Sequence, residues 1–250
     1  MTGKIKSAVI LAAGLGFRLE GRTGEKPKGF LTVGGEAIIK RSIANLLENG
    51  IEKIIIGTGY ASAAYEELAA MSERIVCIKN SQFRDTGSMF TLFNAKDGIA
   101  GDFLLLESNL VYDKNGLKSL LEDPFHSIIL SSGLTSASDG VYIEADESGY
   151  LVNMSKRPGA LARVSSELVG ISKISGAAFK AMCSFAKSRF NDEPKLDYEY
   201  ALVGISRETK ILVKKLEGYL WGEIDDEAHL KMVSEIVLPK IKEAELHERS

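Results

Sequence analysis

The sequence predicts one α/β domain built on a Rossmann-like mixed sheet flanked by helices. Short apolar runs typical of buried strands alternate with segments that place apolar residues at helical spacing. The continuous run Ala8–Leu11 indicates a strand covered on both faces, as in parallel sheets. From Gly140 onward the strands become polar and alternating, with no helix between the first two. This change favours antiparallel pairing and therefore a mixed sheet.

The first half of the chain alternates strands and helices in a regular order. Apolar residues recur at helical spacing between Glu36 and Asn49, and Asn49-Gly50 is a good helix stop because glycine accepts the left-handed conformation. Lys53–Thr58 and Arg74–Lys79 are short apolar runs rich in isoleucine and valine, which favours strands. The expected strands are 8–11, 53–58, 74–79, 103–106 and 127–130, and the expected helices are 36–49, 61–71, 88–95 and 117–122.

The second half begins with strands and ends on helices. Alternating polar and apolar residues predict strands over 141–145, 150–154 and 167–174. Helical spacing then predicts helices over 177–190 and 196–203, followed by a strand over 211–216 and a closing helix from about 227 to 245. Because no repeat, low-complexity tract or linker interrupts the chain, residues 1–250 are expected to form a single domain, which a longer fusion protein could also contain.

Composition and charge exclude several classes of protein. With 45% hydrophobic and 26% charged residues, the chain is neither collagen-like nor disordered, and its two distant cysteines form no disulfide framework. Lys and Arg number 31 against 34 Asp and Glu, so a broad basic surface for nucleic acid is not expected. No apolar run near the start approaches the ~20 residues that a membrane helix needs. We therefore expect a cytoplasmic protein with a small anionic ligand, and neither nucleic acid nor membrane as a partner.

The most informative motif follows the first strand. It reads Leu11-Ala12-Ala13-Gly14-Leu15-Gly16-Phe17-Arg18-Leu19, and Lys26-Pro27-Lys28 follows after a polar loop. Glycines after a strand let backbone N–H groups turn toward phosphate oxygens, and Arg18, Lys26 and Lys28 supply cations for a polyphosphate. Leu19 stands where a dinucleotide fingerprint requires a third glycine, which disfavours a dehydrogenase. By itself, the glycine pair is equally compatible with an ordinary strand-to-helix turn.

The whole string, Leu-Ala-Ala-Gly-x-Gly-x-Arg-Leu followed by Pro-Lys, resembles the signature of the sugar-nucleotide pyrophosphorylase-like nucleotidyltransferase superfamily. The resemblance implies a GT-A-like architecture, with Arg18 and Lys28 as catalytic cations at the phosphates of a nucleoside triphosphate. From residue type alone, Ser88 could instead be a helix cap. The nucleotide-binding residues expected from the resemblance are Leu11, Ala12, Ala13, Gly14, Gly16, Gly59, Tyr60, Asn80, Thr86, Gly87 and Ser88.

Further segments resemble one branch of this superfamily. Gly87–Leu92 and Glu107–Tyr112 look like the enzymes that make CDP-linked amino alcohols and phosphonates. Val169–Ser172, Asp197–Tyr200 and Glu223–Asp226 look closest to bacterial 2-aminoethylphosphonate cytidylyltransferases. This resemblance implies CTP and 2-aminoethylphosphonate as substrates, phosphonate biosynthesis as the setting, and an aminotransferase as a possible fused or partner protein. The related phosphocholine cytidylyltransferases are the alternative.

A divalent cation is expected because one anion must attack the phosphorus of another. Mg²⁺ held by hard oxygen ligands would absorb that charge. The resemblance implies an aspartate after the strand over 103–106 and a second one at Asp225, but Asn109 stands at the first position and offers only a neutral oxygen. Asn109 is either natural variation, with Glu107 supplying charge, or an engineered carboxylate-to-amide change, which we favour. It also keeps open a catalytically impaired nucleotide-binding module.

The acceptor is expected to bind through residues of the second half together with Glu107. An aminoethyl group ends in an ammonium, which favours carboxylates and an aromatic face, and Asp197, Tyr198 and Glu199 offer both. Lys156 is expected to clamp the phosphonate and to act in catalysis. From residue types alone, the acids fit equally well at the start of a helix, and Lys156 fits an exposed turn.

Overall fold

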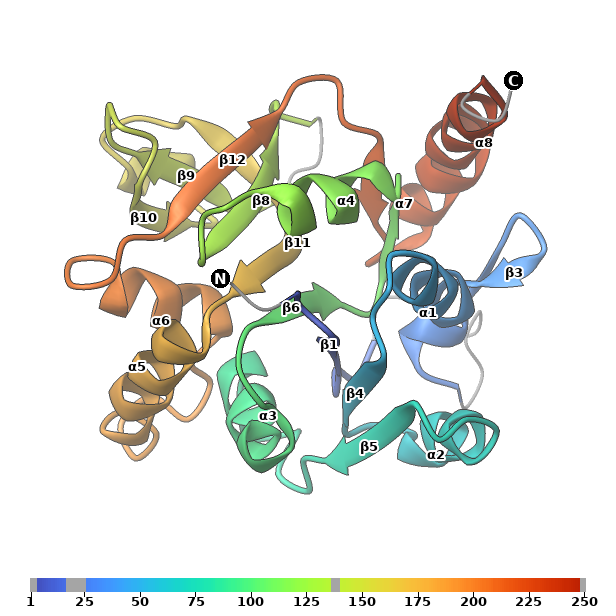
Figure 1. The fold of residues 1–250 in the computed structure, drawn as a ribbon, viewed down its shortest axis with the longest axis horizontal. Helices are drawn as coiled ribbons and strands as arrows, with labels where there is room; N and C mark the ends of the chain where they lie inside the picture. Colours follow the sequence, from blue (N-terminus) through green and yellow to red (C-terminus); the bar gives the residue numbers. More distant parts are fainter. Residues whose placement is uncertain (1–3, 17–25, 136–139, 248–250) are drawn as a thin grey trace.

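Nine strands form one mixed sheet in the computed structural model, which describes residues 4–16, 26–135 and 140–247 (Figure 1). They are β1 (Ser7–Ala12), β4 (Lys53–Thr58), β5 (Ile75–Lys79), β6 (Phe103–Glu107), β8 (Ile128–Ser132), β9 (Tyr142–Ala145), β10 (Leu151–Ser155), β11 (Ser166–Ile174) and β12 (Leu212–Leu216). β5, β4, β1 and β6 run parallel, and β11 pairs antiparallel with β6. From β11 the sheet continues through β9 to β10 and, separately, through β8 to β12. The predicted fold class is confirmed.

Helices cover both faces of the sheet. They are α1 (Ile38–Glu48), α2 (Ser62–Ala70), α3 (Ser88–Asn94), α4 (Asn115–Glu122), α5 (Gly176–Lys187), α6 (Tyr198–Ile205), α7 (Glu227–Met232) and α8 (Leu238–His247). Val9 and Leu11 of β1 pack in one core with α3, α5 and α6, whereas Ala8 and Ile10 pack in another with α1, α2 and α4. Figure 1 shows these two groups of helices on opposite sides of the sheet. Burial on both faces explains why β1 is apolar throughout.

Short strands account for two differences from the predicted elements. β2 (Thr32–Val33) pairs with β3 (Glu36–Ala37), so α1 begins at Ile38 and not at Glu36. β7 (Leu110–Tyr112) pairs with β13 (Trp221–Glu223) in a separate ribbon. Strands of two or three residues carry too little alternation to be recognised. The closing helix is also divided, because a π-helical turn over Val233–Val237 separates α7 from α8.

β11 joins the parallel and antiparallel parts of the sheet through a bend. Its pairing with β8 shifts register between Leu168 and Ser172. Gly170, between them, has φ +81°, and a Cβ atom there would lie 3.1 Å from Oε1 of Glu107. Glycine therefore satisfies both the left-handed backbone and the close approach of β11 to the end of β6.

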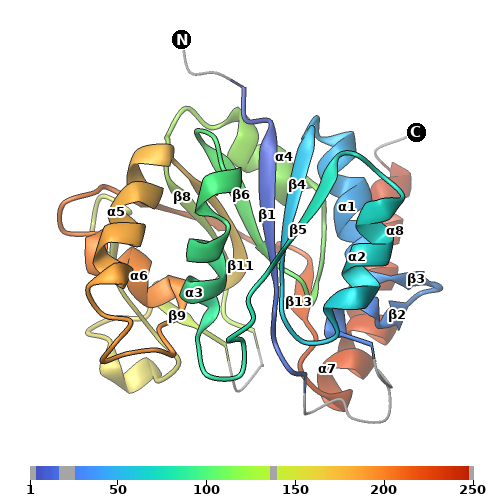
Figure 2. The same cartoon turned by 90° about the horizontal axis from the view of Figure 1, so that it is seen from below.

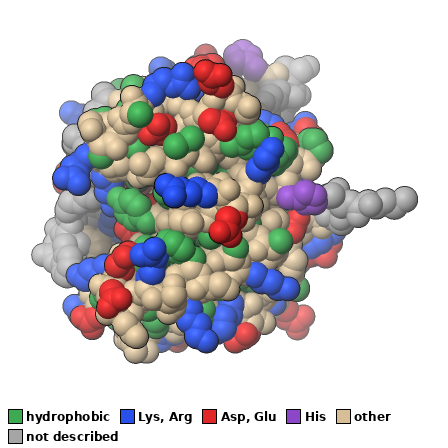
Figure 3. Space-filling model, turned by 90° about the vertical axis from the view of Figure 1, so that its left-hand side faces the viewer, with side chains coloured by type: hydrophobic (Ala, Val, Ile, Leu, Met, Phe, Trp, Pro, Cys, Tyr) green, Lys and Arg blue, Asp and Glu red, His purple; other side chains and the backbone are tan. Residues whose placement is uncertain are grey.

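The C-terminal ends of the parallel strands lie beside the C-terminal part of the chain. Figure 2 shows β13 and α7 near the end at which β1 finishes. In open α/β sheets this edge is where ligands bind. Basic and acidic side chains are interspersed on the face drawn in Figure 3. Within the described ranges, the helices are too short or too polar to cross a membrane.

Candidate active site

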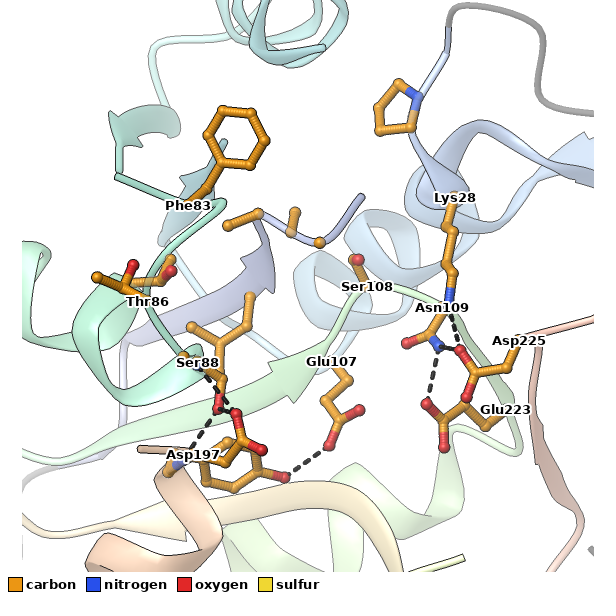
Figure 4. A pocket seen from close by; sticks show the side chains of 18 of the residues that line it. Lys28, Phe83, Thr86, Ser88, Glu107, Ser108, Asn109, Asp197, Glu223 and Asp225 are labelled. Atoms are coloured by element: carbon orange, nitrogen blue, oxygen red, sulfur yellow. Dashed lines mark hydrogen bonds and ion pairs between the residues drawn. The ribbon is translucent and has the colours of Figure 1, made fainter. Parts of the chain in front are cut away.

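An open cavity of about 390 Å³ lies at the C-terminal ends of β1 and β6, beside the starts of α3 and α6 (Figure 4). Fifteen of the predicted site residues line it, and so do six that were not among the predicted site residues. The predicted ones are Leu11, Ala12, Ala13, Gly14, Lys28, Thr86, Gly87, Ser88, Glu107, Asn109, Lys156, Asp197, Tyr198, Glu199 and Asp225. The others are Pro27, Tyr65, Phe83, Thr91, Ser108 and Glu223. The structure therefore brings residues from both halves of the chain to one place.

The end of β1 forms the backbone wall of this cavity. Leu11 O accepts a hydrogen bond from Ser108 N at 3.1 Å, which ties the end of β1 to the end of β6. Gly14 is exposed, and a Cβ atom there would meet nothing within 4 Å, so the chain is open toward the cavity. Gly16 has φ +69° and lies against the side chain of Lys28. Arg18 lies outside the described residues.

The predicted residues that do not line the cavity have structural contacts of their own. Asn80 is fully buried, and its Nδ2 donates to Thr86 Oγ1 at 2.9 Å and to Thr91 Oγ1 at 3.0 Å. A Cβ atom at Gly59 would lie 2.6 Å from the Cβ of Phe83, so this glycine permits close packing. Asn80 thus holds Thr86 in place at the rim. A direct nucleotide contact by Gly16, Gly59, Tyr60 or Asn80 stays a prediction.

A cluster of charged and amide groups lies on one side of the cavity. Lys28 Nζ forms an ion pair with Asp225 Oδ1. Asn109 Nδ2 donates to the same Oδ1 at 3.1 Å and to Glu223 Oε1 at 2.8 Å (Figure 4). The ribbon of β7 and β13 explains this contact, because Ile224 N also donates to Asn109 O at 2.9 Å. Lys28 and Asn109 therefore together compensate the charge of Asp225.

A Mg²⁺ ion at this cluster would lie between residue 109 and Asp225. A cation between residue 109 and Asp225 needs oxygen atoms on both sides. Asn109 instead presents its amide nitrogen to Asp225 and Glu223, and the ammonium of Lys28 already contacts Asp225. Among the described residues, no group of three or more His, Cys, Asp or Glu side chains is arranged to hold a metal ion. As arranged, the residues do not fit a cation between them, and Mg²⁺ binding stays a prediction.

The opposite side of the cavity carries carboxylates. Tyr198 Oη donates to Glu107 Oε1 at 2.8 Å, and the neighbouring Glu199 is 8% exposed, with no hydrogen-bond partner for Oε2 among the described residues. Burial and the Asp197 charge raise the pKa of Glu199, although Lys156 acts in the opposite direction. Burial and the Glu199 charge likewise raise the pKa of Glu107. This side therefore favours a bound cation or proton.

Lys156 is the basic group on the acidic side. It follows β10 and lines the cavity from an exposed position. Partial burial works to lower its pKa, but the carboxylates of Asp197 and Glu199 outweigh burial and raise it. Lys156 therefore carries a positive charge at neutral pH beside the acids, as a clamp for an anionic group requires.

A second cavity of about 170 Å³ adjoins the first along carboxylates from both of its sides. The two share Glu107, Lys156, Glu199, Glu223 and Asp225. The second adds a mixed wall of apolar, aromatic and polar side chains, which includes Val141, Glu167, Leu168, Val169, Trp221, His229 and Met232. Trp221 is tied in place, because its Nε1 donates to Ser132 Oγ at 2.9 Å. The shared carboxylates thus separate a polar cavity from a smaller, more apolar one.

Comparison with known proteins relates this geometry to a family. Residues 8–105, which include β1 and the glycine loop, match the family model of the MobA-like NTP transferase domain. Over these residues the chain is similar to MobA-like NTP transferase domains. The predicted resemblance to nucleotidyltransferases is confirmed.

Curated relatives extend the similarity over most of the chain. The Bifunctional protein GlmU of Methanococcus aeolicus is 27% identical and covers 94% of this chain, and the match spans 55% of GlmU. The choline-phosphate cytidylyltransferase of Streptococcus pneumoniae is 26% identical over 92% of this chain and 97% of its own length. The 2-aminoethylphosphonate cytidylyltransferase of Lancefieldella rimae is 22% identical over 90% of both. The chain spans about half the length of the first curated relatives it matches.

A solved structure supports the fold. The inositol-1-phosphate CTP transferase from T. maritima superimposes with a TM-score of 0.82 over 97% of this chain and 98% of its own, at 21% identity. At this identity the likeness shows the architecture alone. It agrees with the predicted nucleotidyltransferase fold.

Proposed function

We propose that this chain is a CTP-dependent cytidylyltransferase that transfers CMP to 2-aminoethylphosphonate and releases pyrophosphate. The observation that carries the proposal is a single open cavity that combines the backbone of Leu11–Gly14 and Lys28 on one side with Lys156 and the carboxylates on the other. A triphosphate suits the first side, and an acceptor with one anionic and one cationic end suits the second. The curated relatives that use a CMP donor, by their names, support CTP as the nucleotide.

The proposed reaction is a direct displacement at phosphorus. A phosphonate oxygen of the acceptor attacks the α-phosphorus of CTP, the bond from that phosphorus to the bridging oxygen breaks, and pyrophosphate leaves with the electron pair. The chain then contributes alignment and charge neutralisation, with no covalent intermediate. Lys28 neutralises the α-phosphate, Lys156 holds the phosphonate, and Arg18 is expected to assist at the phosphates.

Acceptor selection is assigned to the acidic side. Oε2 of Glu199 is buried without a hydrogen-bond partner among the described residues, so an ammonium group that donates a hydrogen bond would satisfy it. A primary amine can donate in this way, whereas a quaternary ammonium cannot. The aromatic face of Trp221 in the adjoining cavity keeps phosphocholine as the alternative acceptor.

A catalytically impaired nucleotide-binding module is the second candidate function. The hydrogen bond from Asn109 to Asp225 favours it, because an amide and an ammonium stand where the resemblance implies a cation site. Such a chain would bind CTP through the same cavity but turn over slowly. In this alternative the chemical step is slow, whereas nucleotide binding is unaffected.

Pyrophosphate release tests the proposal. The purified chain is mixed with each of four nucleoside triphosphates and with 2-aminoethylphosphonate, phosphocholine or a hexose 1-phosphate, at a fixed Mg²⁺ concentration. We expect release with CTP and 2-aminoethylphosphonate, and CTP binding is measured in parallel by calorimetry. CTP binding without release, in both the wild type and Asn109→Asp, supports the binding module. The absence of CTP binding overturns both candidates.

A further inference from the structure

The first residues of α3 and α6 are joined by crossed hydrogen bonds. Ser88 N and Ser88 Oγ both donate to Asp197 Oδ1, at 3.2 Å and 3.1 Å. Tyr198 N donates to Ser88 Oγ at 2.9 Å in return. Figure 4 shows Ser88 and Asp197 facing each other at the edge of the cavity. The first backbone N–H group of each helix therefore donates to a side chain at the start of the other helix.

This arrangement replaces the usual capping of a helix by its own sequence. The first N–H groups of a helix have no partner within that helix. Asp197 directly precedes α6 but makes no side-chain cap within it, and its carboxylate accepts from α3 instead. Ser88 Oγ accepts from the first residue of α6. Losing either side chain leaves a donor at the start of the partner helix unsatisfied.

The backbone around these residues reinforces the connection. Gly87 N donates to Pro194 O at 3.0 Å, and Met89 N donates to Leu196 O at 3.2 Å. A Cβ atom at Gly87 would lie 2.3 Å from Leu196 O, so glycine is needed for this approach. The turn before α3 and the segment before α6 are therefore in direct contact over several residues.

The two joined segments carry residues predicted for different ligands. The resemblance assigns Thr86–Ser88 to the nucleotide, Tyr198 and Glu199 are assigned to the acceptor, and all of them line the cavity. Tyr198 is 2% exposed, and its hydroxyl group holds Glu107. A shift at the start of α6 would therefore move Tyr198, Glu199 and the Glu107 carboxylate together.

We propose that Ser88 and Asp197 are positioning residues that couple the nucleotide side of the cavity to the acceptor side, an inference that rests on the proposed function. Asp197 then acts through its hydrogen bonds to α3 and not as the counter-ion of the acceptor ammonium. Ser88 then acts through α6 and not by reading the base. The coupling makes acceptor affinity depend on Ser88, although Ser88 lies on the nucleotide side.

Ser88→Ala and Ser88→Thr test the coupling through the hydroxyl group. Ser88→Ala removes the oxygen that accepts a hydrogen bond from Tyr198 N, but the backbone N–H of residue 88 can still donate to Asp197. The KM for the acceptor substrate should rise on the order of tenfold, whereas the KM for CTP should stay within about twofold of wild type. Ser88→Thr retains the hydroxyl group and should restore the acceptor KM. Equal acceptor KM values in wild type and Ser88→Ala overturn the coupling.

Asp197→Asn tests whether Asp197 acts through its hydrogen bonds or through its charge. An asparagine oxygen can still accept from Ser88 but carries no charge, so the acceptor KM should stay within about threefold of wild type, whereas Asp197→Ala should raise it on the order of tenfold. If Asp197→Asn raises the acceptor KM as much as Asp197→Ala, Asp197 binds the ammonium directly, and the proposed role is overturned.

Ser175→Ala is the matched control for loss of a helix cap. Ser175 Oγ accepts from Ala178 N at 3.0 Å at the start of α5, and Ser175 lines neither cavity of the site. This variant should lower the melting temperature but leave both KM values unchanged. If Ser88→Ala behaves in the same way, its role is only structural and the inference fails. Absence of CTP and acceptor binding in the wild type, measured by calorimetry, overturns the proposed function itself and the inference with it.

Discussion

The amide of Asn109 donates to the carboxylate of Asp225, with 3.1 Å between Nδ2 and Oδ1, and the ammonium of Lys28 contacts the same carboxylate oxygen. Asp225 is only 9% exposed, so this charge depends on its neighbours within the protein. The contact links residue 109, at the end of β6, to the start of the C-terminal helices. It also shows the contacts of Asn109, which stands where the resemblance implies an aspartate.

Asn109→Asp is expected to raise kcat at a fixed Mg²⁺ concentration. A second carboxylate opposite Asp225 removes the amide donor and supplies a charged oxygen ligand, so Mg²⁺ affinity should rise on the order of tenfold or more. Pyrophosphate release and direct titration with Mn²⁺ measure the two effects. Asn153→Asp, in β10 and away from the cavity lining, is the control for the added charge. Equal or lower activity of Asn109→Asp would contradict the prediction.

Lys28→Ala is expected to reduce kcat on the order of 10²-fold, as losing one group that stabilises developing charge commonly does. Lys28 lines the cavity together with the backbone at the end of β1, where the proposed function places the phosphates of CTP. Lys26→Ala is the matched control, because Lys26, which the sequence also offered as a cation for the phosphates, is exposed and does not line the cavity. Steady-state pyrophosphate release measures both variants. Similar losses in the two variants would show that the effect is not specific to position 28.

Local motifs predicted most residues of the cavity lining, but Glu223 was not among the predicted site residues. The end of β1 and Lys28 belong to one short string, so their proximity follows from the local chain. Glu223 meets Asn109 only because β13 pairs with β7, a three-residue contact across more than 100 positions of sequence. No local pattern reports such a pairing. Glu223 was therefore missed as a cavity residue.

Residue type alone also did not predict which partner each polar side chain has. Asn80 and Asp197 were both predicted to contact ligands. In the structure, the amide of Asn80 holds Thr86 and Thr91, and Asp197 accepts from Ser88. The sequence indicated that these groups belong near the site, but their partners depend on the packing of α3 against the rest of the domain.

The stability of the protein is expected to fall as pH rises from about 5 to 8, in part because of Glu199. Burial and the Asp197 charge raise the pKa of Glu199 to about 8 from the model-peptide value of 4.5. Between these values the native state holds a proton that the unfolded state has lost, so the free energy of unfolding decreases with pH. Glu199→Gln should make this slope shallower in urea denaturation at several pH values. The exposed Glu67→Gln is the control, and an unchanged slope in Glu199→Gln would contradict the assignment.

Gly87→Ala is expected to lower the free energy of unfolding by about 1–3 kcal/mol, the usual cost of forcing extra volume into a packed contact. The new Cβ atom would lie 2.3 Å from Leu196 O and 2.6 Å from the carbonyl carbon of Lys195, and both are backbone atoms that a side-chain rotation cannot relieve. Gly159→Ala is the matched control, because a Cβ atom at Gly159 would meet nothing within 4 Å. Urea denaturation of the two variants measures the difference. If Gly87→Ala matches Gly159→Ala in stability, the contact between the start of α3 and the segment before α6 is less close than the structure shows, and the coupling between Ser88 and Asp197 loses its backbone support.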